Sequence, residues 1–151
     1  MKLTDILSAD CVRVPLKATD RTGAIEELVD LLNEAGKFTD RDAVLRAVLD
    51  REATRSTGIG LGLAVPHGKS AACPALAMAV GKPAAPLDFQ SKDGQPVNLV
   101  VLLASPPDQT GPHIQALARI SRLMLMDAFR RAVADADSAG ELYQTIHEHE
   151  A

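Results

Sequence analysis

One histidine in a glycine-rich segment is the residue whose surroundings best suit chemistry. His67 closes a stretch in which glycine recurs at positions 58, 60 and 62, and Arg51 and Arg55 lie just upstream at the end of a helical pattern. An imidazole is largely unprotonated near neutral pH, so it can act there as a nucleophile. A histidine on a stiff, uncrowded turn beside guanidinium groups is suited to attack an anionic phosphoryl centre.

The residues next to His67 favour a fixed presentation of its ring. Pro66 pushes the residue before it towards an extended conformation, so the ring follows a short extended run at 63–65. Gly68 takes the next side chain out of the approach path, and N–H groups at Gly60 and Gly68 are candidates to cradle a phosphoryl group. The pattern also fits a tight turn whose histidine merely hydrogen-bonds to the backbone, and both interpretations stay open.

Spacing argues against the common nucleotide-binding loops. A P-loop has four residues between its first glycine and the Gly-Lys-Ser/Thr triplet, whereas five separate Gly62 from Gly68 here. The segment from Gly58 also lacks the third glycine of the dinucleotide fingerprint. We therefore expect no nucleotide and no other cofactor.

Side chains near His67 can bind phosphoryl oxygens. Arg51 can pair with them bidentately, although an arginine here is also typical of a solvated ion pair with Asp50 or Glu52. The hydroxyls of Ser56 and Thr57 can donate hydrogen bonds, and both residues are equally common in turns. Arg51 and Thr57 are therefore candidates for the surroundings of a phosphoryl group.

A second histidine, His113, lies at a predicted helix start directly after Pro112. The unpaired N–H groups and dipole of a helix N-terminus favour anions and disfavour imidazolium, so a neutral ring is expected there. Such a ring can orient His67 or hold a phosphoryl oxygen. A plain exposed histidine in the first helical turn fits the spacing equally well.

No metal or redox centre is predicted. His147 and His149 lie two residues apart near the end of the chain, without the partners of a zinc motif, and we expect a frayed polar tail there. Cys11 and Cys73 match no metal or redox spacing, and both are expected to be ordinary buried thiols.

Composition indicates one globular domain, over residues 1–151, that is 46% hydrophobic and 24% charged. A net charge of −4, 3% aromatic residues and no Trp argue against a nucleic-acid partner, and favour a protein or a small anion. The longest apolar run, 99–104, is too short to span a membrane, and the first residues do not resemble a signal peptide. We expect a cytoplasmic protein.

The first third of the chain is expected to fold as a strand and two helices. Residues 11–16 alternate enough for a short strand. Asp20 then opens a helix whose apolar residues recur at helical spacing. Thr39, with Asp42 three residues on, resembles a capping box that begins a second helix. The glycine-rich segment that follows is expected to be a loop.

The remainder predicts the elements that complete a helix-covered sheet. Strands are expected at 75–80 and 97–104, and the second is almost wholly apolar, which places it centrally. Pro112 is expected at the first position of a helix that presents Ile114 on its apolar face. Two shorter helices follow. This order of elements predicts a sheet with helices on both faces.

The sequence around His67 resembles a known signature. Glu52, the pair 59–60 and the run Leu63-Ala64-Val65-Pro66-His67-Gly68 resemble the active-site signature of the fructose/mannitol-type (type 2) enzyme IIA domains of the bacterial phosphotransferase system. The similarity covers almost the whole chain and is nearest to the nitrogen regulatory branch. It implies an α+β fold, a three-layer α/β/α sandwich around a mixed β-sheet, which agrees with the predicted element order.

The resemblance also implies a mechanism. His67 would accept a phosphoryl group on Nε2 from a phosphohistidine carrier, HPr or its nitrogen-branch paralogue. Arg51 aligns with the family's essential arginine and His113 with its second active-site histidine. We expect in-line transfer within a transient protein complex, with Arg51 neutralising charge and no metal. Leu61 departs from the pattern, because many nitrogen-branch relatives carry Asn there and a polar contact is lost; Ile114 replaces the more usual Leu.

The downstream role stays open. Ile59, Leu61 and Leu63 are expected to offer an apolar docking surface. Residues 1–151 include no segment that resembles a IIB domain, a IIC domain or HPr. This favours a free-standing regulator whose phosphorylation switches binding of a target protein. A sugar-transport component would instead pass the group to a IIB domain. An interaction module without phosphorylation and a small-anion-binding protein also fit the sequence.

Overall fold

The most apolar strand forms the middle of the sheet. In the computed structural model, which describes residues 2–150, β6 (Leu99–Ser105) is buried along its whole length. It pairs antiparallel with β5 (Ala77–Pro83), which pairs in parallel with β1 (Val12–Leu16). Each large apolar side chain buried in this way contributes about 1.5–3 kcal/mol. The predicted central strand is confirmed, starting two residues later than expected.

The glycine-rich segment expected to be a loop instead forms three short strands. β3 (Leu63–Ala64) and β4 (His67–Lys69) both pair in parallel with β6, one after the other, and β2 (Gly58–Gly60) pairs antiparallel with β3. His67 is thereby opposite Leu103 of the central strand. The prediction failed because these strands are too short to show a period of their own: β3 and β4 form by pairing with β6, and β2 by pairing with β3.

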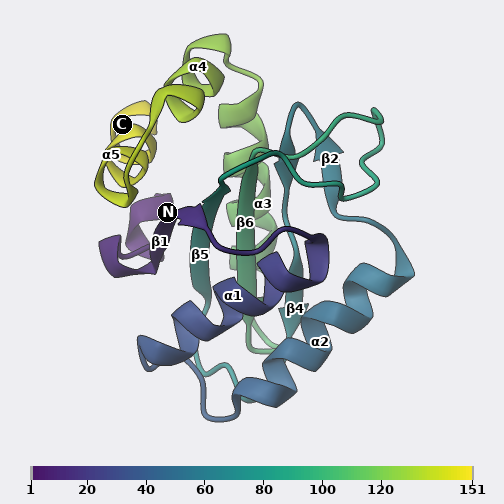
Figure 1. The fold of residues 1–151 in the computed structure, drawn as a ribbon. Helices are drawn as coiled ribbons and strands as arrows, with labels where there is room; N and C mark the ends of the chain where they lie inside the picture. Colours follow the sequence, from purple (N-terminus) through teal and green to yellow (C-terminus); the bar gives the residue numbers. More distant parts are fainter. Residues whose placement is uncertain (1, 151) are drawn as a thin grey trace.

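Two layers of helices enclose this sheet. α1 (Arg21–Glu34) contacts β5 and β6, and α2 (Arg41–Thr54) contacts β4, on one face (Figure 1). Asp20 caps α1 as predicted, by accepting a hydrogen bond from Gly23 N–H. The predicted capping box at Thr39 is wrong by one residue, because Asp40 caps α2 while Thr39 hydrogen-bonds to the carbonyl of Ala72.

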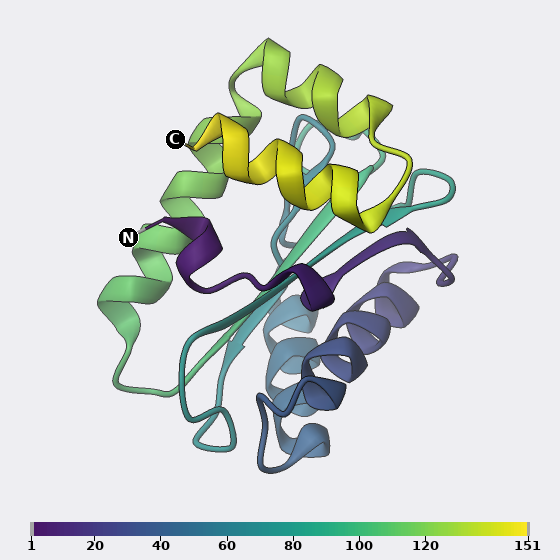
Figure 2. The same cartoon turned by 90° about the vertical axis from the view of Figure 1, so that its left-hand side faces the viewer.

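The other face carries the C-terminal helices. α3 (Thr110–Met124) lies against β6 and α5 (Ala139–His149) against β1, with α4 (Asp127–Asp135) between them in sequence. Figure 2 shows the sheet edge-on between the two helical layers. The three-layer α/β/α sandwich with a mixed sheet is confirmed. No helix among residues 2–150 is long and apolar enough to span a membrane.

α3 differs from its prediction in start and in orientation. It begins at Thr110, so Pro112 occupies its third position rather than its first. Ile114, expected on the buried face, is 59% exposed, whereas His113 is only 4% exposed. Ile120 and Met124 are buried as predicted, so the buried face is rotated towards His113 and Ala116 by less than the step of about 100° between successive residues. The rotation follows from a polar contact, described below, that hydrophobic periodicity does not report.

The β2–β3 hairpin turns through a conformation that leucine disfavours. Leu61 and Gly62 connect the two strands with φ of 58° and 80°, the signs required by a two-residue type I′ turn. Gly62 adopts positive φ freely, but an L-residue with a Cβ loses about 1–2 kcal/mol there. Leu61 is also 46% exposed, so burial of its side chain offsets little of this cost.

Replacing Leu61 with Asn is expected to stabilise the fold. Asn adopts positive φ more readily, and Asn-Gly is the favoured pair for this turn, so Leu61→Asn should raise the free energy of unfolding by about 0.5–1 kcal/mol. Urea denaturation measures the change. Leu61→Ala is the control, because it shortens the side chain without relieving the backbone; equal stabilities of the two variants would contradict the interpretation.

Candidate active site

The imidazole of His67 is held with one nitrogen occupied and the other open. Its Nδ1 lies 2.7 Å from the carbonyl oxygen of Val65. A carbonyl can only accept, so Nδ1 carries the proton and Nε2 of the neutral ring keeps its lone pair. Nε2 has no hydrogen-bond partner among the described residues. The sequence analysis left open a histidine that merely hydrogen-bonds to the backbone. That hydrogen bond is present, and it leaves Nε2 as the nitrogen that is free to react.

His113 meets His67 although they come from different elements. The ring centroids are 5.2 Å apart with planes at 70°, one ring projecting from β4 and the other from α3. Nδ1 of His113 lies 2.8 Å from Oγ of Ser105, a buried residue at the end of β6. If the hydroxyl donates to Nδ1, Nε2 of His113 is left as a donor. The plain alternative of an exposed histidine is wrong.

Burial and nearby cations keep both rings neutral. Burial is the main cause that lowers the pKa of His67, and the charges of Arg51 and Lys69 lower it further, against opposing contributions from the Val65 carbonyl and Glu52. Burial, then the neighbouring His67 and Lys69, lowers the pKa of His113 to about 4. At neutral pH, Nε2 of His67 is therefore available as a nucleophile.

Lys69 is a cation of this site that the sequence analysis missed. Successive strand residues point to opposite faces, so His67 and Lys69 share one face of β4. Nζ of Lys69 donates to Oγ1 of Thr110, the first residue of α3, at 2.9 Å, and its charge acts on both histidines. The sequence could have indicated Lys69 because it lies two residues after His67. That spacing is informative only once the segment is known to be a strand.

Arg51 lies in the last turn of α2, in the helical layer opposite the one that contributes His113. Its Nη1 donates to the carbonyl of Arg55 at 2.9 Å, beyond the end of the helix. Arg55 has an extended backbone, so the two arginines do not share a helix face as their spacing suggested. Within residues 2–150, no carboxylate lies in ion-pair distance of Arg51, so the alternative of a pair with Asp50 or Glu52 is wrong.

Thr57 supports the site from inside the protein. It is buried, and both its N–H and its hydroxyl donate to the carboxylate of Glu52, at 2.9 and 2.5 Å. Its hydroxyl proton is therefore already used. Gly60 precedes the hairpin turn with φ of 106°, a conformation that favours glycine. A contact of Thr57, Gly60 or Gly68 with a phosphoryl group stays a prediction.

Gly68 serves a different purpose from the one expected. A Cβ at this position would lie 2.9 Å from the backbone N of Val48 and 3.0 Å from the carbonyl carbon of Ala47, both in α2. The missing side chain therefore admits helix α2 rather than a docking partner. Of the three apolar residues expected to offer a docking surface, Leu63 is fully buried and does not contribute, whereas Ile59 and Leu61 are exposed.

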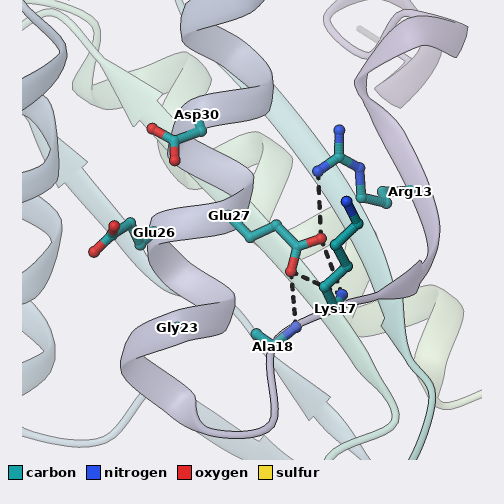
Figure 3. A pocket seen from close by; sticks show the side chains of 7 residues that line it. All are labelled: Arg13, Lys17, Ala18, Gly23, Glu26, Glu27 and Asp30. Atoms are coloured by element: carbon teal, nitrogen blue, oxygen red, sulfur yellow. Dashed lines mark hydrogen bonds and ion pairs between the residues drawn. The ribbon is translucent and has the colours of Figure 1, made fainter.

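The other candidates lie outside this cluster. Cys11 and Cys73 are free and buried, as predicted. The expected frayed tail is wrong, since α5 runs to His149 and that ring packs edge-on against Phe129. No group of three metal-ligating side chains occurs among the residues that the structure describes. A cleft of about 390 Å³ between β1 and α1 is separate from the histidines (Figure 3).

Comparison with known sequences identifies the chain's relatives. A profile of the family described as "Phosphoenolpyruvate-dependent sugar phosphotransferase system, EIIA 2" matches residues 5–149. The fructose-specific EIIABC component of Bacillus subtilis is 35% identical over 99% of this chain and 24% of its own length. The nitrogen regulatory protein of Bradyrhizobium diazoefficiens is 32% identical over 97% of this chain and 95% of its own. This chain thus spans about a quarter of the first relative and almost all of the second.

Solved structures share the fold. The nitrogen regulatory protein IIA-Ntr of Neisseria meningitidis superposes with a TM-score of 0.87 at 26% identity, covering 95% of this chain and 98% of that one. The mannitol IIA of Escherichia coli gives a TM-score of 0.78 at 22% identity, covering 93% and 98%, and shows the fold alone.

Substituting Gly68 is expected to separate the strand from helix α2. The Cβ of Gly68→Ala meets backbone atoms that cannot move independently, so the free energy of unfolding should fall by about 1–3 kcal/mol. Urea denaturation tests this. Gly111→Ala is the matched control, because a Cβ there meets nothing within 4 Å and the helix should tolerate it. A Gly68→Ala protein as stable as the control would refute the close approach.

Removing the charge of Lys69 is expected to raise the pKa of His67. A nearby cation disfavours imidazolium, so Lys69→Met should make the ring easier to protonate. Titration of the His67 ring by NMR gives the pKa directly. Lys82→Met is the control, because Lys82 instead donates to carbonyls of Ala134 and Ala136 at the end of α4. An unchanged or lower pKa in Lys69→Met would contradict the charge effect.

Proposed function

Because the chain belongs to the EIIA type 2 family of the phosphoenolpyruvate-dependent sugar phosphotransferase system, whose members are phosphotransferase components, we propose that it carries a phosphoryl group on Nε2 of His67. The observation that carries this proposal is the tethered, neutral ring with its open nitrogen beside two cations. The donor would be a phosphohistidine carrier protein, HPr or its nitrogen-branch paralogue. The reaction would take place in the cytoplasm.

The ring geometry suits a direct exchange between two imidazoles. The lone pair on Nε2 of His67 forms the new N–P bond as the N–P bond of the donor histidine breaks, and the donor imidazole leaves with that electron pair. His67 keeps its proton on Nδ1, where the Val65 carbonyl stabilises the positive charge that develops on the ring. The protein needs to supply mainly position and charge neutralisation.

The neighbouring side chains have separate roles in this proposal. Arg51 from α2 and Lys69 from β4 neutralise the oxygens of the transferring group from two directions. Nε2 of His113, oriented by Ser105, donates a hydrogen bond to one of these oxygens. Because His113 has a pKa of about 4, it contributes as a neutral donor rather than as a cation.

We further propose a regulatory output in which phosphorylation of His67 changes binding of a target protein. Supporting this, the Neisseria IIA-Ntr structure fits with a TM-score of 0.87, and a nitrogen regulatory protein matches along nearly its whole length. The second candidate is a sugar-transport component that passes the group to a IIB domain. It is supported by the fructose-specific EIIA component of Haloferax volcanii, 31% identical over 98% of both chains.

Phosphoryl transfer is tested by intact mass. Incubation with enzyme I, phosphoenolpyruvate and one of the two carriers, HPr or its nitrogen-branch paralogue, should give one acid-labile phosphoryl adduct, absent in His67→Ala. Arg51→Met should slow its formation by about 10²–10³, as expected when one preorganised charge-stabilising group is lost. His147→Ala is the control and should react normally. Subsequent addition of a IIB domain separates the two outputs, because only a transport component should lose its phosphoryl group to it.

Two outcomes would contradict the proposal. A wild-type protein that forms no adduct with either carrier would indicate an interaction module. Binding of inorganic phosphate at His67, seen by NMR without any adduct, would indicate a small-anion-binding protein.

A further inference from the structure

A buried carboxylate is connected by hydrogen bonds to the segment that carries the nucleophile. Glu52, in the last turn of α2, is 5% exposed and is the next residue after Arg51. It forms a long ion pair with Arg21 at the start of α1, with 3.8 Å between Nη1 and the carboxylate. An ionised carboxylate is costly to bury unless its oxygens are hydrogen-bonded. Here both oxygens accept from Thr57, one from its N–H and the other from its hydroxyl.

Hydrogen bonds continue from Glu52 to the ring of His67. The carbonyl of Thr57 accepts from Val65 N–H at 3.0 Å. The carbonyl of Val65 in turn accepts from Nδ1 of His67 at 2.7 Å. Thr57 and Val65 are therefore each held from two sides, and the ring is attached to the end of this series. It joins α2 to β4 through residues that touch no reacting atom.

We propose that Glu52 is a positioning residue that, through Thr57 and Val65, keeps the proton of His67 on Nδ1 and its Nε2 open. The inference deepens the proposed function, but its structural part does not require phosphorylation to occur. Two of its three links are contacts of the backbone of Val65, so the position of that carbonyl decides whether Nδ1–H has its acceptor. Without that acceptor, the ring can rotate and exchange tautomers.

The charge of Glu52 adds a second effect. It opposes Arg51 and Lys69 by raising the pKa of His67, whereas both cations lower it. The carboxylate thus balances part of the positive charge around the ring. Because it lies inside the protein and its oxygens face Thr57, it can do so without facing the incoming phosphoryl group.

The test uses Glu52→Gln in the full chain. The amide keeps the shape of the side chain but has one acceptor oxygen, so one Thr57 donor is left without its partner. In ¹⁵N NMR spectra of the unphosphorylated protein, the fraction of His67 with the proton on Nδ1 should fall. The pKa of His67 should fall too, because a nearby negative charge is removed. In single-turnover phosphorylation from HPr, the rate should fall about 10- to 100-fold, the cost of a misplaced reactant.

Glu27 offers a matched control. Its carboxylate is also largely buried and holds a chain segment, by accepting from the N–H groups of Lys17 and Ala18 and from Arg13 (Figure 3). Glu27→Gln therefore removes an equivalent structural carboxylate whose contacts are with Arg13, Lys17 and Ala18 and not with the His67 segment. It should lower the free energy of unfolding without changing the His67 tautomer, its pKa or the phosphorylation rate.

The outcomes separate positioning from stability. If Glu52→Gln keeps the wild-type tautomer and rate, or if Glu27→Gln changes them equally, the proposal is overturned. If Glu52→Gln does not fold, Thr57→Val takes its place, since it removes only the hydroxyl bond and should shift the tautomer in the same direction to a smaller extent. A wild-type protein that is never phosphorylated would refute the proposed function, while the tautomer measurement would still decide the role of Glu52.

Discussion

The hydrogen bond from His67 Nδ1 to the Val65 carbonyl is the contact on which the site depends. It fixes which nitrogen carries the proton, and therefore which one is free to react. For that carbonyl to stay in place, the backbone around it must be held, and pairing of β3 and β4 with the central strand does this. The fully buried strand β6 thus positions the backbone that holds the His67 ring.

The electrostatics follow from where the two histidines meet. Bringing both rings together partly inside the protein, close to Lys69, disfavours protonation of each, and Arg51 adds to this effect at His67. A site built this way is positively charged through its guanidinium and ammonium groups while its nucleophile stays neutral. That combination attracts an anionic group without protonating the atom that must attack it.

Close packing explains features that first suggest ligand binding. Gly68 has no side chain because the backbone of α2 takes that space, and this approach brings Arg51 and Glu52 near His67. The positive φ at Gly60 and Gly62 likewise belongs to a tight hairpin. Glycines beside a reactive residue can therefore serve the packing that positions the site, as well as the approach of a ligand.

The sequence was sufficient for the layered architecture, the central strand and the choice of His67, Arg51 and His113 as candidates, because these depend on periodicity, composition and a recognisable motif. The sequence did not predict strands β2 to β4, the rotation of α3 or the contribution of Lys69 to the site. Short strands have no period to detect; β3 and β4 form by pairing with β6, and β2 forms by pairing with β3. The rotation of α3 depends on a hydrogen bond between His113 and Ser105, and the grouping of Lys69 with two histidines depends on strand direction. Such contacts join residues that the chain keeps apart, so they arise only when the sheet and its helices pack together.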